Sequence, residues 1–560
     1  MTQEPDFLHW YETNLPARER KIRGHYSTPT RLIEQILDVC GYTADQDLSR
    51  LRVLDPACGS GNFLTGAVRR LMASEEQFKR SPGMLVKHIQ HNIWGFDPDP
   101  IACFLAEMQI RSTFSAHYPH IKTLRNLHIH QADGLAFPWE QSSNHQAVDL
   151  FLANPPYLAA KNNDLSGYRS AHQRGQSDSY LFFLDLALQI VRPGGWICLV
   201  VPDPVLARIN ATQERKRLLA ETTIHHLWHL ANVFTAYVGA VVIIARKGAP
   251  SKHHLIQWRR ERWHPRNMNA LTTPTPILNT QPQHVEQSLL RRQPNAELRY
   301  LLSNQKNKLL EQLSLYTHDF KQDFSATANR LTSPHPLQPL RQLVTIRRGE
   351  ELGKDSPYLH THSSAHHNAY YHPVLRGGID VRPYSSLQAS RYIAREHISK
   401  PLERYLTPKL LLVKSVGRLQ ATLDTQGHVV LQTLYMLHLT QPPTEQASFT
   451  QEDELYFLLA LLNSRLLQEY VYVLYTAYKW VQPQIEQHVL ANLPIPVDID
   501  PTAKRAIIER ARQLMQACAQ TTPALKLKEQ IKQSLYEEQE QAIHALYVMA
   551  LIKQQHREIS

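Results

Sequence analysis

The sequence predicts an α/β domain built on a parallel sheet, followed by a smaller α+β domain and a helical C-terminal segment. In the front part, short apolar runs end in an acid, as in Val53-Leu54-Asp55 and in Ile93 to Asp97. Apolar residues at helical spacing separate these runs, as expected of successive β-α-β units. Short strand patterns dominate residues 337–500, and a helical pattern returns in residues 501–560.

Composition limits the class of protein. The 560 residues are enough for two or three domains, and 42% hydrophobic with 20% charged residues is ordinary for a soluble globular protein. No apolar run approaches the roughly 20 residues that span a bilayer. Residues 1–10 carry acids where a signal peptide would carry basic residues. We therefore expect a cytoplasmic protein with no membrane partner.

Charge and cysteine content narrow the chemistry. The net charge is +11, of which residues 1–250 contribute +2 and the remaining 310 contribute +9. A basic C-terminal part is expected of a region that contacts phosphate backbone, although a basic soluble surface would have the same composition. The five cysteines show neither zinc-site spacing nor a disulfide framework, and none follows a proline. We expect no covalent catalysis through sulfur.

A glycine turn lies between the first predicted strand and a predicted helix, in the string Asp55-Pro56-Ala57-Cys58-Gly59-Ser60-Gly61-Asn62-Phe63-Leu64. Its two glycines allow the backbone to approach a ligand closely, and the helix N-terminus favours a negative group. No third glycine follows at the spacing of the dinucleotide fingerprint, so a pyrophosphate is a poor fit.

Two further strand patterns end in acids. Asp97 follows Ile93 to Phe96, and its carboxylate suits the two hydroxyls of a ribose, with helix capping as the alternative. Asp133 follows an alternating stretch that contains His128 and His130. We interpret these histidines as partly solvated strand residues, because no other ligand cluster is near them, and we predict no metal site.

The residues from Asp149 to Tyr157 form the most informative stretch. A buried strand pattern ends in Asn154-Pro155-Pro156-Tyr157, and proline cannot donate to a ladder, so this tip projects from the carboxyl edge of the sheet. The Asn154 amide oxygen and the Pro155 carbonyl are two acceptors for one amino group. Tyr157 offers a flat face for a planar ring. The pattern indicates modification of an exocyclic amine on an aromatic base.

Together these motifs resemble the gamma class of N6-adenine DNA methyltransferases, in its TaqI-like and type IIG-like group. The glycine string matches the family's cofactor loop, whereas Ser27 replaces an aromatic residue of the segment before Thr28-Pro29. The resemblance implies a Rossmann-like class I S-adenosylmethionine-dependent methyltransferase domain. It implies cofactor binding by Thr28, Pro29, Asp55, Ala57, Gly59, Gly61, Asn62, Phe63, Asp97 and Asp133, and catalysis with Asn154, Pro155, Pro156, Tyr157 and Phe234.

The C-terminal half resembles the target-recognition region of type IIG-like enzymes more loosely. We expect domains at 1–248 (methyltransferase), 249–336 (linker and helical spacer), 337–500 (DNA target recognition) and 501–560 (helical). Candidate DNA contacts are Arg347, Arg348, Arg376, Lys414 and Arg418, for which a solvated surface is the competing interpretation. A loop with His360, His362, His366 and His367 could bind metal, but a polar loop is the simpler interpretation.

The expected function is site-specific methylation of N6 on a flipped-out adenine, with S-adenosylmethionine as cofactor and double-stranded DNA as partner. A restriction-modification or phage-defence system is the expected setting, with a separate endonuclease or defence proteins as further partners and a monomer as the active form. The alternatives are an N4-cytosine DNA methyltransferase, a protein-glutamine methyltransferase, and a DNA-binding subunit without chemistry. We expect no fused nuclease.

Overall fold

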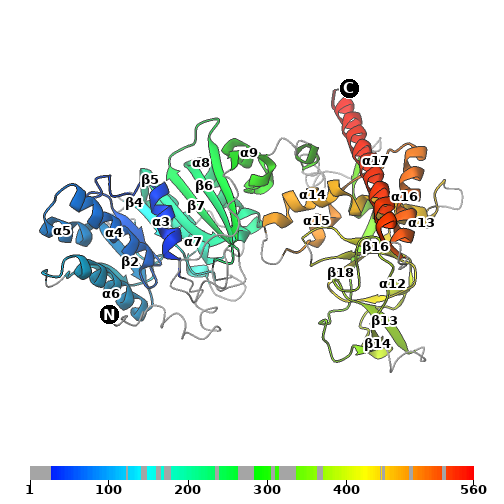
Figure 1. Ribbon diagram of the computed structural model, residues 1–560, viewed down its shortest axis with the longest axis horizontal. Coiled ribbons are helices and arrows are strands. Elements are labelled where there is room, and N and C mark those ends of the chain that lie inside the picture. The colour runs from blue at the N-terminus through cyan, green and yellow to red at the C-terminus, as the bar shows by residue number, and fades with distance from the viewer. Residues whose placement is uncertain are drawn as a thin grey trace. The chain divides into compact units, whose positions relative to one another are not determined.

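The computed structural model describes residues 27–121, 124–139, 148–158, 165–168, 178–233, 239–262, 283–303, 309–314, 336–361, 370–415, 417–441, 443, 448–478, 483–519 and 525–559. The chain divides into two compact units, Met1–Ser303 and Asn304–Ser560, and each is described by itself (Figure 1).

The first unit is built on a nine-stranded sheet with the order β3-β2-β1-β4-β5-β7-β6-β8-β9. The strands β1 to β5 are parallel to one another, and β7 lies antiparallel between β5 and β6. The strand bounds are β1 Val53–Asp55, β2 Ile93–Asp97, β3 His128–Gln131, β4 Val148–Ala153, β5 Val191–Pro202, β6 Thr222–Ala231, β7 Ala240–Lys247, β8 Leu255–Arg262 and β9 Gln283–Glu286. The predicted α/β class with a parallel sheet is confirmed.

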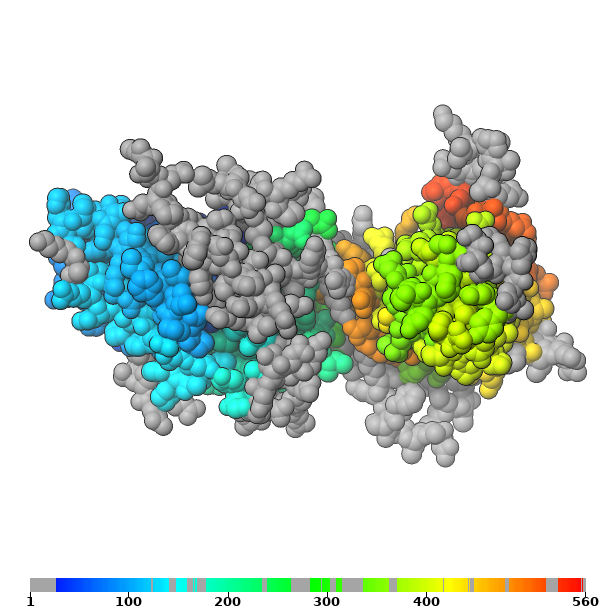
Figure 2. Space-filling model, turned by 90° about the horizontal axis from the view of Figure 1, so that it is seen from below, coloured from blue at the N-terminus to red at the C-terminus, as the bar shows by residue number. Residues whose placement is uncertain are grey.

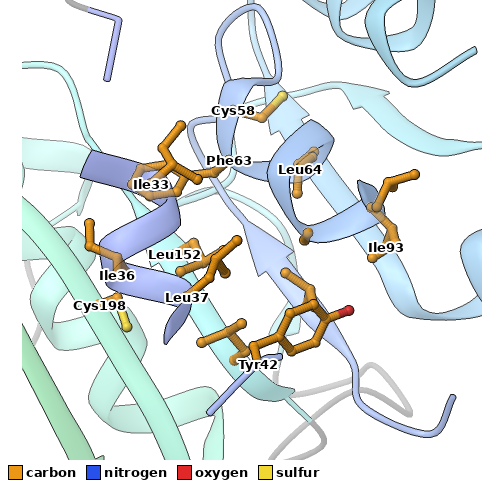
Figure 3. Packing of buried hydrophobic residues seen from close by; sticks show 14 of the residues in the cluster. Ile33, Ile36, Leu37, Tyr42, Cys58, Phe63, Leu64, Ile93, Leu152 and Cys198 are labelled. Carbon is orange, nitrogen blue, oxygen red and sulfur yellow. The ribbon is translucent and has the colours of Figure 1, made fainter. Parts of the chain in front are cut away.

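Helices connect these strands and cover the sheet. They are α3 Thr30–Val39, α4 Asn62–Gln77, α5 Pro82–Asn92, α6 Pro100–His117, α7 Ser179–Ile190, α8 Thr212–Glu221 and α9 Gln287–Arg292. Figure 1 shows α3 lying in front of the sheet, and Figure 3 shows its Ile33 and Ile36 packed with Phe63 of α4 over Leu152 of β4. Burial of this apolar face, at about 25 cal/mol per Å² removed from water, fixes the strand ends that carry polar residues.

The sheet extends beyond residue 248, which differs from the predicted linker and spacer at 249–336. Strand β8 pairs in parallel with β6, and β9 pairs antiparallel with β8. The stretch is rich in arginine, but Ile256 and Trp258 alternate with less buried residues and are themselves buried. This period of two makes it a strand of the first unit's sheet, between β6 and β9, rather than a linker.

The second unit contains two four-stranded sheets that share an apolar core, with orders β11-β18-β15-β16 and β12-β14-β13-β17. Residues of this part of the chain, yellow-green in Figure 2, form much of the face of the second unit seen there. The bounds are β11 Val344–Arg348, β12 His360–Thr361, β13 Tyr371–Leu375, β14 Arg391–Ala394, β15 Lys409–Val413, β16 Ala421–Asp424, β17 Val429–Val430 and β18 Leu434–Leu439, and β10 Leu337–Pro339 pairs with β19 Pro494–Pro496.

Helices complete the second unit and confirm the predicted α+β class with a helical C-terminal segment. They are α11 Leu340–Leu343, α12 Glu403–Leu406, α13 Gln451–Asn463, α14 Arg465–Leu474, α15 Gln487–Ala491, α16 Pro501–Ala519 and α17 Leu525–Ile559. Among the described residues, no helix combines the length and the apolar character needed to cross a membrane.

Candidate active site

The carboxyl ends of the parallel strands meet at one edge of the first unit's sheet, and a cavity of about 720 Å³ opens there. Residues from the ends of β1, β2, β3 and β4 and from the start of α7 line it. The structure brings nine of the predicted site residues into this one cavity, namely Thr28, Ala57, Gly59, Asn62, Phe63, Asp97, Asp133, Asn154 and Pro156.

Among the predicted site residues that the structure describes in the first unit, the cavity wall lacks Pro29, Asp55, Gly61, Pro155 and Tyr157. Asp55 is 1% exposed behind the glycine turn, and Pro29 occupies the position before α3. Gly61 has a φ of +89°, and a Cβ atom there would lie 2.7 Å from the Cβ of Ala106. Gly61 therefore serves the close packing of α4 against α6. The predicted catalytic Phe234 lies outside the described residues.

Asp97 holds the glycine turn in place. Its Oδ2 accepts a hydrogen bond from the Gly59 N–H at 3.0 Å, and its Oδ1 accepts one from the Asp99 N–H at 2.9 Å. The N–H of Cys58 donates to the carbonyl of Phe96 at 2.9 Å. Asp97 also lines the cavity, and an ionised carboxylate there is an acceptor for hydroxyl groups of a ligand.

Asp55 is a buried acid near the Ala57 N–H group and the Asp97 carboxylate. Its Oδ1 accepts the Ala57 N–H at 3.1 Å. Burial, reinforced by the nearby charge of Asp97, raises the pKa of Asp55 to about 8. A positive group beside it would favour its charged form and lower that pKa.

The side chain of Asn62 connects the segment before α3 to the glycine turn. The Asn62 side chain donates to the Thr28 carbonyl at 3.3 Å, and its Oδ1 accepts a hydrogen bond from Gln109 of α6 at 3.2 Å. Gln109 also donates to the Ser60 carbonyl at 2.7 Å. The predicted ligand Asn62 thus also holds Thr28 at the cavity wall.

Asp133 is held at both carboxylate oxygens. Its Oδ1 accepts the Leu135 N–H at 2.9 Å, and its Oδ2 accepts a hydrogen bond from the Tyr168 hydroxyl. The next residue, Gly134, lies against the glycine turn: a Cβ atom there would be 2.2 Å from the Pro56 carbonyl oxygen. Only glycine allows the ends of β1 and β3 to approach so closely.

The tip after β4 is fastened to the start of α7. The Ser179 hydroxyl donates to the Pro156 carbonyl and accepts the Leu158 N–H at 2.9 Å, while the Ser179 N–H donates to the Leu158 carbonyl at 3.0 Å. Tyr157 is half-buried against the core, and its hydroxyl donates to the Val200 carbonyl at 3.4 Å. Asn154 and Pro156 remain in the cavity wall.

Comparison with known proteins decides the family. A model of N-6 DNA methylases matches residues 5–274, and a model of TaqI-like C-terminal specificity domains matches residues 372–495. The chain combines an N-6 DNA methylase domain with a TaqI-like specificity domain. The first domain holds the whole cavity, and its sheet is typical of class I S-adenosylmethionine-dependent methyltransferases.

Two curated relatives are similar to less than half of this chain. The type II methyltransferase M.BstVI of Geobacillus stearothermophilus is 26% identical over 238 residues, 40% of this chain and 42% of the relative. The type II methyltransferase M.PaeR7I of Pseudomonas aeruginosa is 28% identical over 192 residues, 32% of each. The aligned part therefore spans less than half the length of these curated relatives.

Two solved structures share the fold over most of the chain. The type IIL restriction-modification enzyme MmeI in complex with DNA gives a TM-score of 0.60 at 12% identity, covering 96% of this chain and 78% of that one. A DrdV–DNA complex gives 0.54 at 13% identity, with coverage of 91% and 59%. At such identities the similarity shows the fold alone.

Sequence reasoning missed the contribution of α7 and of residue 168 to the methylase cavity. The additional wall residues from this part of the chain are Leu158, Leu165, Tyr168, Ser179, Phe182 and Phe183. The apolar pattern of residues 180–191 predicts a core helix, and the polar stretch 161–178 fits a DNA-contacting loop and an ordinary surface loop equally well. The available signal was positional: α7 begins at the same sheet edge as the Asn-Pro-Pro-Tyr tip.

The predicted DNA contacts of the second unit have different environments. Arg347 and Arg348 are exposed on β11, and Arg418 is exposed with its guanidinium 5.2 Å from the centre of the Tyr472 ring. Lys414 is partly buried. Arg376 is 13% exposed and forms an ion pair with Asp380, at 2.9 Å between Nε and Oδ2. This ion pair favours a structural role for Arg376 over the predicted DNA contact.

The cysteine residues and the two histidines of β3 lie in packed surroundings. The five cysteines are free, and the Sγ atoms of Cys40 and Cys198 lie 3.0 Å apart in the core. His128 and His130 of β3 stack on Trp94 and Phe96 of β2. Within the described ranges no three histidine, cysteine or acidic residues could hold a metal ion, and His362, His366 and His367 lie outside those ranges.

Proposed function

We propose that this protein is a site-specific DNA methyltransferase that transfers a methyl group from S-adenosylmethionine to the N6 amino group of adenine. The observation that carries the proposal is the shared cavity. The acceptor Asn154, the acids Asp97 and Asp133, and the glycine turn line one space of about 720 Å³. This volume is in the range of small-molecule and cofactor sites, roughly 300–1,000 Å³.

The cavity residues fit S-adenosylmethionine by their chemistry. Asp97 has acceptor capacity for ribose hydroxyls, and Asp133 has it for a purine amino group. The rings of Phe63 and Phe182 provide apolar walls for a purine. Burial raises the pKa of Asp55 to about 8, and a cationic ligand would stabilise its carboxylate. A cofactor with an ammonium and a sulfonium group matches this acidic, partly aromatic pocket.

We assign the catalytic work to the tip after β4. The Asn154 amide oxygen and the Pro155 carbonyl accept the two N–H bonds of the target amine. These bonds draw the nitrogen toward a tetrahedral geometry and make its lone pair available. S-adenosylmethionine, when bound, supplies an electrophilic methyl group. The contribution of the protein is positioning and electrostatic preorganisation.

The target base must leave the duplex to reach this cavity, which costs a few kcal/mol. We propose that Tyr157 and Phe234 stack on the extruded base, at about 1–3 kcal/mol per contact, and so offset that cost. Double-stranded DNA is the partner, and the exposed Arg347, Arg348 and Arg418 are our candidates for phosphate contacts.

We propose residues 337–500 as the target-recognition domain and residues 501–560 as its helical continuation. The proposed setting is a cytoplasmic restriction-modification or phage-defence system, with a monomeric enzyme and a separate endonuclease or defence proteins as partners.

Modification-sensitive sequencing of DNA from a host that expresses the protein tests this function. We expect N6-methyladenine at one short motif, and none at that motif when the host expresses Asn154→Ala. N4-methylcytosine at the motif would assign the alternative substrate instead, and unmodified DNA alongside folded, cofactor-binding protein would contradict the proposal.

A further inference from the structure

We propose that Tyr168 is a positioning residue for the cofactor: its hydroxyl orients the Asp133 carboxylate toward the purine end of S-adenosylmethionine. The inference rests on the proposed function and deepens it. Tyr168 belongs to the short helix η2 (Ser166–Tyr168), outside every motif that carries the family resemblance.

The geometry around Asp133 leads to this assignment. The Leu135 N–H holds Oδ1 at 2.9 Å, and the Tyr168 hydroxyl donates to Oδ2. A carboxylate with one donor at each oxygen cannot rotate without losing a hydrogen bond. Each oxygen nevertheless keeps one lone pair for a ligand. The side chain is therefore fixed and still able to accept.

The surroundings of this carboxylate identify the ligand group. Tyr168, Phe182 and Leu135 line the same cavity as Asp133, and the rings of Tyr168 and Phe182 have centroids 5.9 Å apart. A carboxylate acceptor beside aromatic and aliphatic walls suits a planar heterocycle that carries an amino group. The adenine end of the cofactor has this chemistry.

The donor role of Tyr168 does not change over the working pH range. Its hydrogen bond to Asp133 raises the pKa of Tyr168 to about 12. The hydroxyl therefore keeps its proton from acidic to moderately alkaline pH. Removing it should have the same effect on cofactor affinity at pH 6 and at pH 9.

Calorimetry of cofactor binding to the full-length protein tests the inference. Tyr168→Phe keeps the ring and removes the donor, so we expect the Kd of S-adenosylmethionine to rise about tenfold, as for loss of a hydrogen bond to a charged group. The Kd of S-adenosylhomocysteine should rise by the same factor, since both share the adenine end, and kcat at saturating cofactor should stay within twofold. The control is Tyr180→Phe, because the buried Tyr180 hydroxyl has no hydrogen-bond partner among the described residues.

A double-mutant cycle with Asp133→Asn separates positioning from simple packing. If Tyr168 acts through Asp133, Tyr168→Phe should have little further effect in the Asp133→Asn background. Additive effects, or wild-type affinity in Tyr168→Phe, would overturn the inference while leaving the methyltransferase assignment intact. A wild-type protein that binds neither cofactor form would instead overturn the proposed function.

Discussion

Two aspartates at the edge of this sheet, Asp97 and Asp55, have different roles because their surroundings differ. Two backbone N–H groups hold the Asp97 carboxylate at 2.9 and 3.0 Å in the cavity wall. Asp55 lies deeper, with one N–H donor and a pKa of about 8. The first carboxylate is ready to accept hydrogen bonds, whereas the second costs folding free energy whenever it is charged.

The buried Asp55 carboxyl predicts a pH-dependent difference in stability. Its pKa is about 8 in the folded protein against 3.8 for the ordinary group, so the folded state binds the extra proton between these values. Its contribution to stability is present below pH 4 and is lost as the pH rises toward 8. Asp55→Asn should therefore gain in melting temperature relative to wild type between pH 5 and pH 8, by about 2–4 °C per kcal/mol.

Asp47→Asn is the opposite control for Asp55→Asn. Its hydrogen bond with Arg80 lowers the pKa of Asp47, so Asp47 stabilises the protein above its unfolded pKa and loses that contribution as the pH falls. At both pH 5 and pH 8, the melting temperature relative to wild type should be higher for Asp55→Asn and lower for Asp47→Asn. A constant difference between Asp55→Asn and wild type would contradict a buried, protonated Asp55. Asp55→Asn should also bind S-adenosylmethionine more weakly than wild type above pH 8.

The hydrogen bonds of Ser179 predict that its loss lowers kcat without changing the affinity for the cofactor. Ser179→Ala leaves the Leu158 N–H without its acceptor and releases the Pro156 carbonyl, so the catalytic tip gains freedom. We expect kcat to fall about tenfold or more, because a misplacement of about 1 Å can cost 100-fold, while the Kd of S-adenosylmethionine stays within twofold.

Ser74→Ala is the matched control for Ser179→Ala. Ser74 is equally buried and donates to the Gln46 carbonyl at 2.6 Å, but it lies near the end of α4, away from the cavity wall. Both variants should lose about 1–3 kcal/mol of stability. Similar kcat values for the two would show that Ser179 supports the fold and not the tip.

At the scale of the elements, the ends of the strands could be predicted and the elements facing them could not. Asp55, Asp97 and Asn154 follow apolar runs, and parallel pairing brings such ends to one edge. The part played by Ser179 depends on where α7 begins in space. The apolar composition of α7 indicates only a buried helix. The arginine-rich composition of β8 likewise suggested a linker, although buried residues alternate along it as in a strand.

The close approach of the ends of β1 and β3 at Gly134 predicts the effect of adding a side chain there. A Cβ atom at this position would lie 2.2 Å from a backbone oxygen of Pro56, so Gly134→Ala must displace the glycine turn. We expect a loss of about 1–3 kcal/mol in stability together with weaker S-adenosylmethionine binding. In Gly83→Ala, within α5, the added methyl group meets no atom within 4 Å and should stabilise by about 0.5–1 kcal/mol. Equal melting temperatures and affinities for the two variants would contradict the close approach.

At the scale of the whole molecule, the basic excess beyond residue 250 is shared between the two compact units: residues 251–303 of the first unit carry +5, and residues 304–560 of the second carry +4. Residues beyond 250 carry +9 of the net +11, and Arg347 and Arg348 are exposed on a strand of the second unit. Arg376, by contrast, is paired with Asp380. Charge counting alone could not distinguish an arginine that is free to contact phosphate from one that holds a loop.

The exposed arginines predict the salt dependence of DNA binding. The double variant Arg347→Gln, Arg348→Gln should weaken binding to all sequences and reduce the slope of log K against log salt by about 1–2 units. The Kd of S-adenosylmethionine should not change, since the cofactor cavity lies in the first unit. Arg376→Gln should lower the melting temperature with the salt slope preserved. An unchanged slope in the double variant would exclude phosphate contacts by β11.

The most direct test of the central claim is transfer of a labelled methyl group from S-adenosylmethionine to DNA of the recognised motif, followed by analysis of the nucleosides. The wild-type protein should place the label on N6 of adenine, and Asn154→Ala should give none while its Kd for S-adenosylmethionine stays within twofold of wild type. Label on adenine with Asn154→Ala, or wild-type label on any other atom, would contradict an amine held by Asn154 at the edge of the sheet.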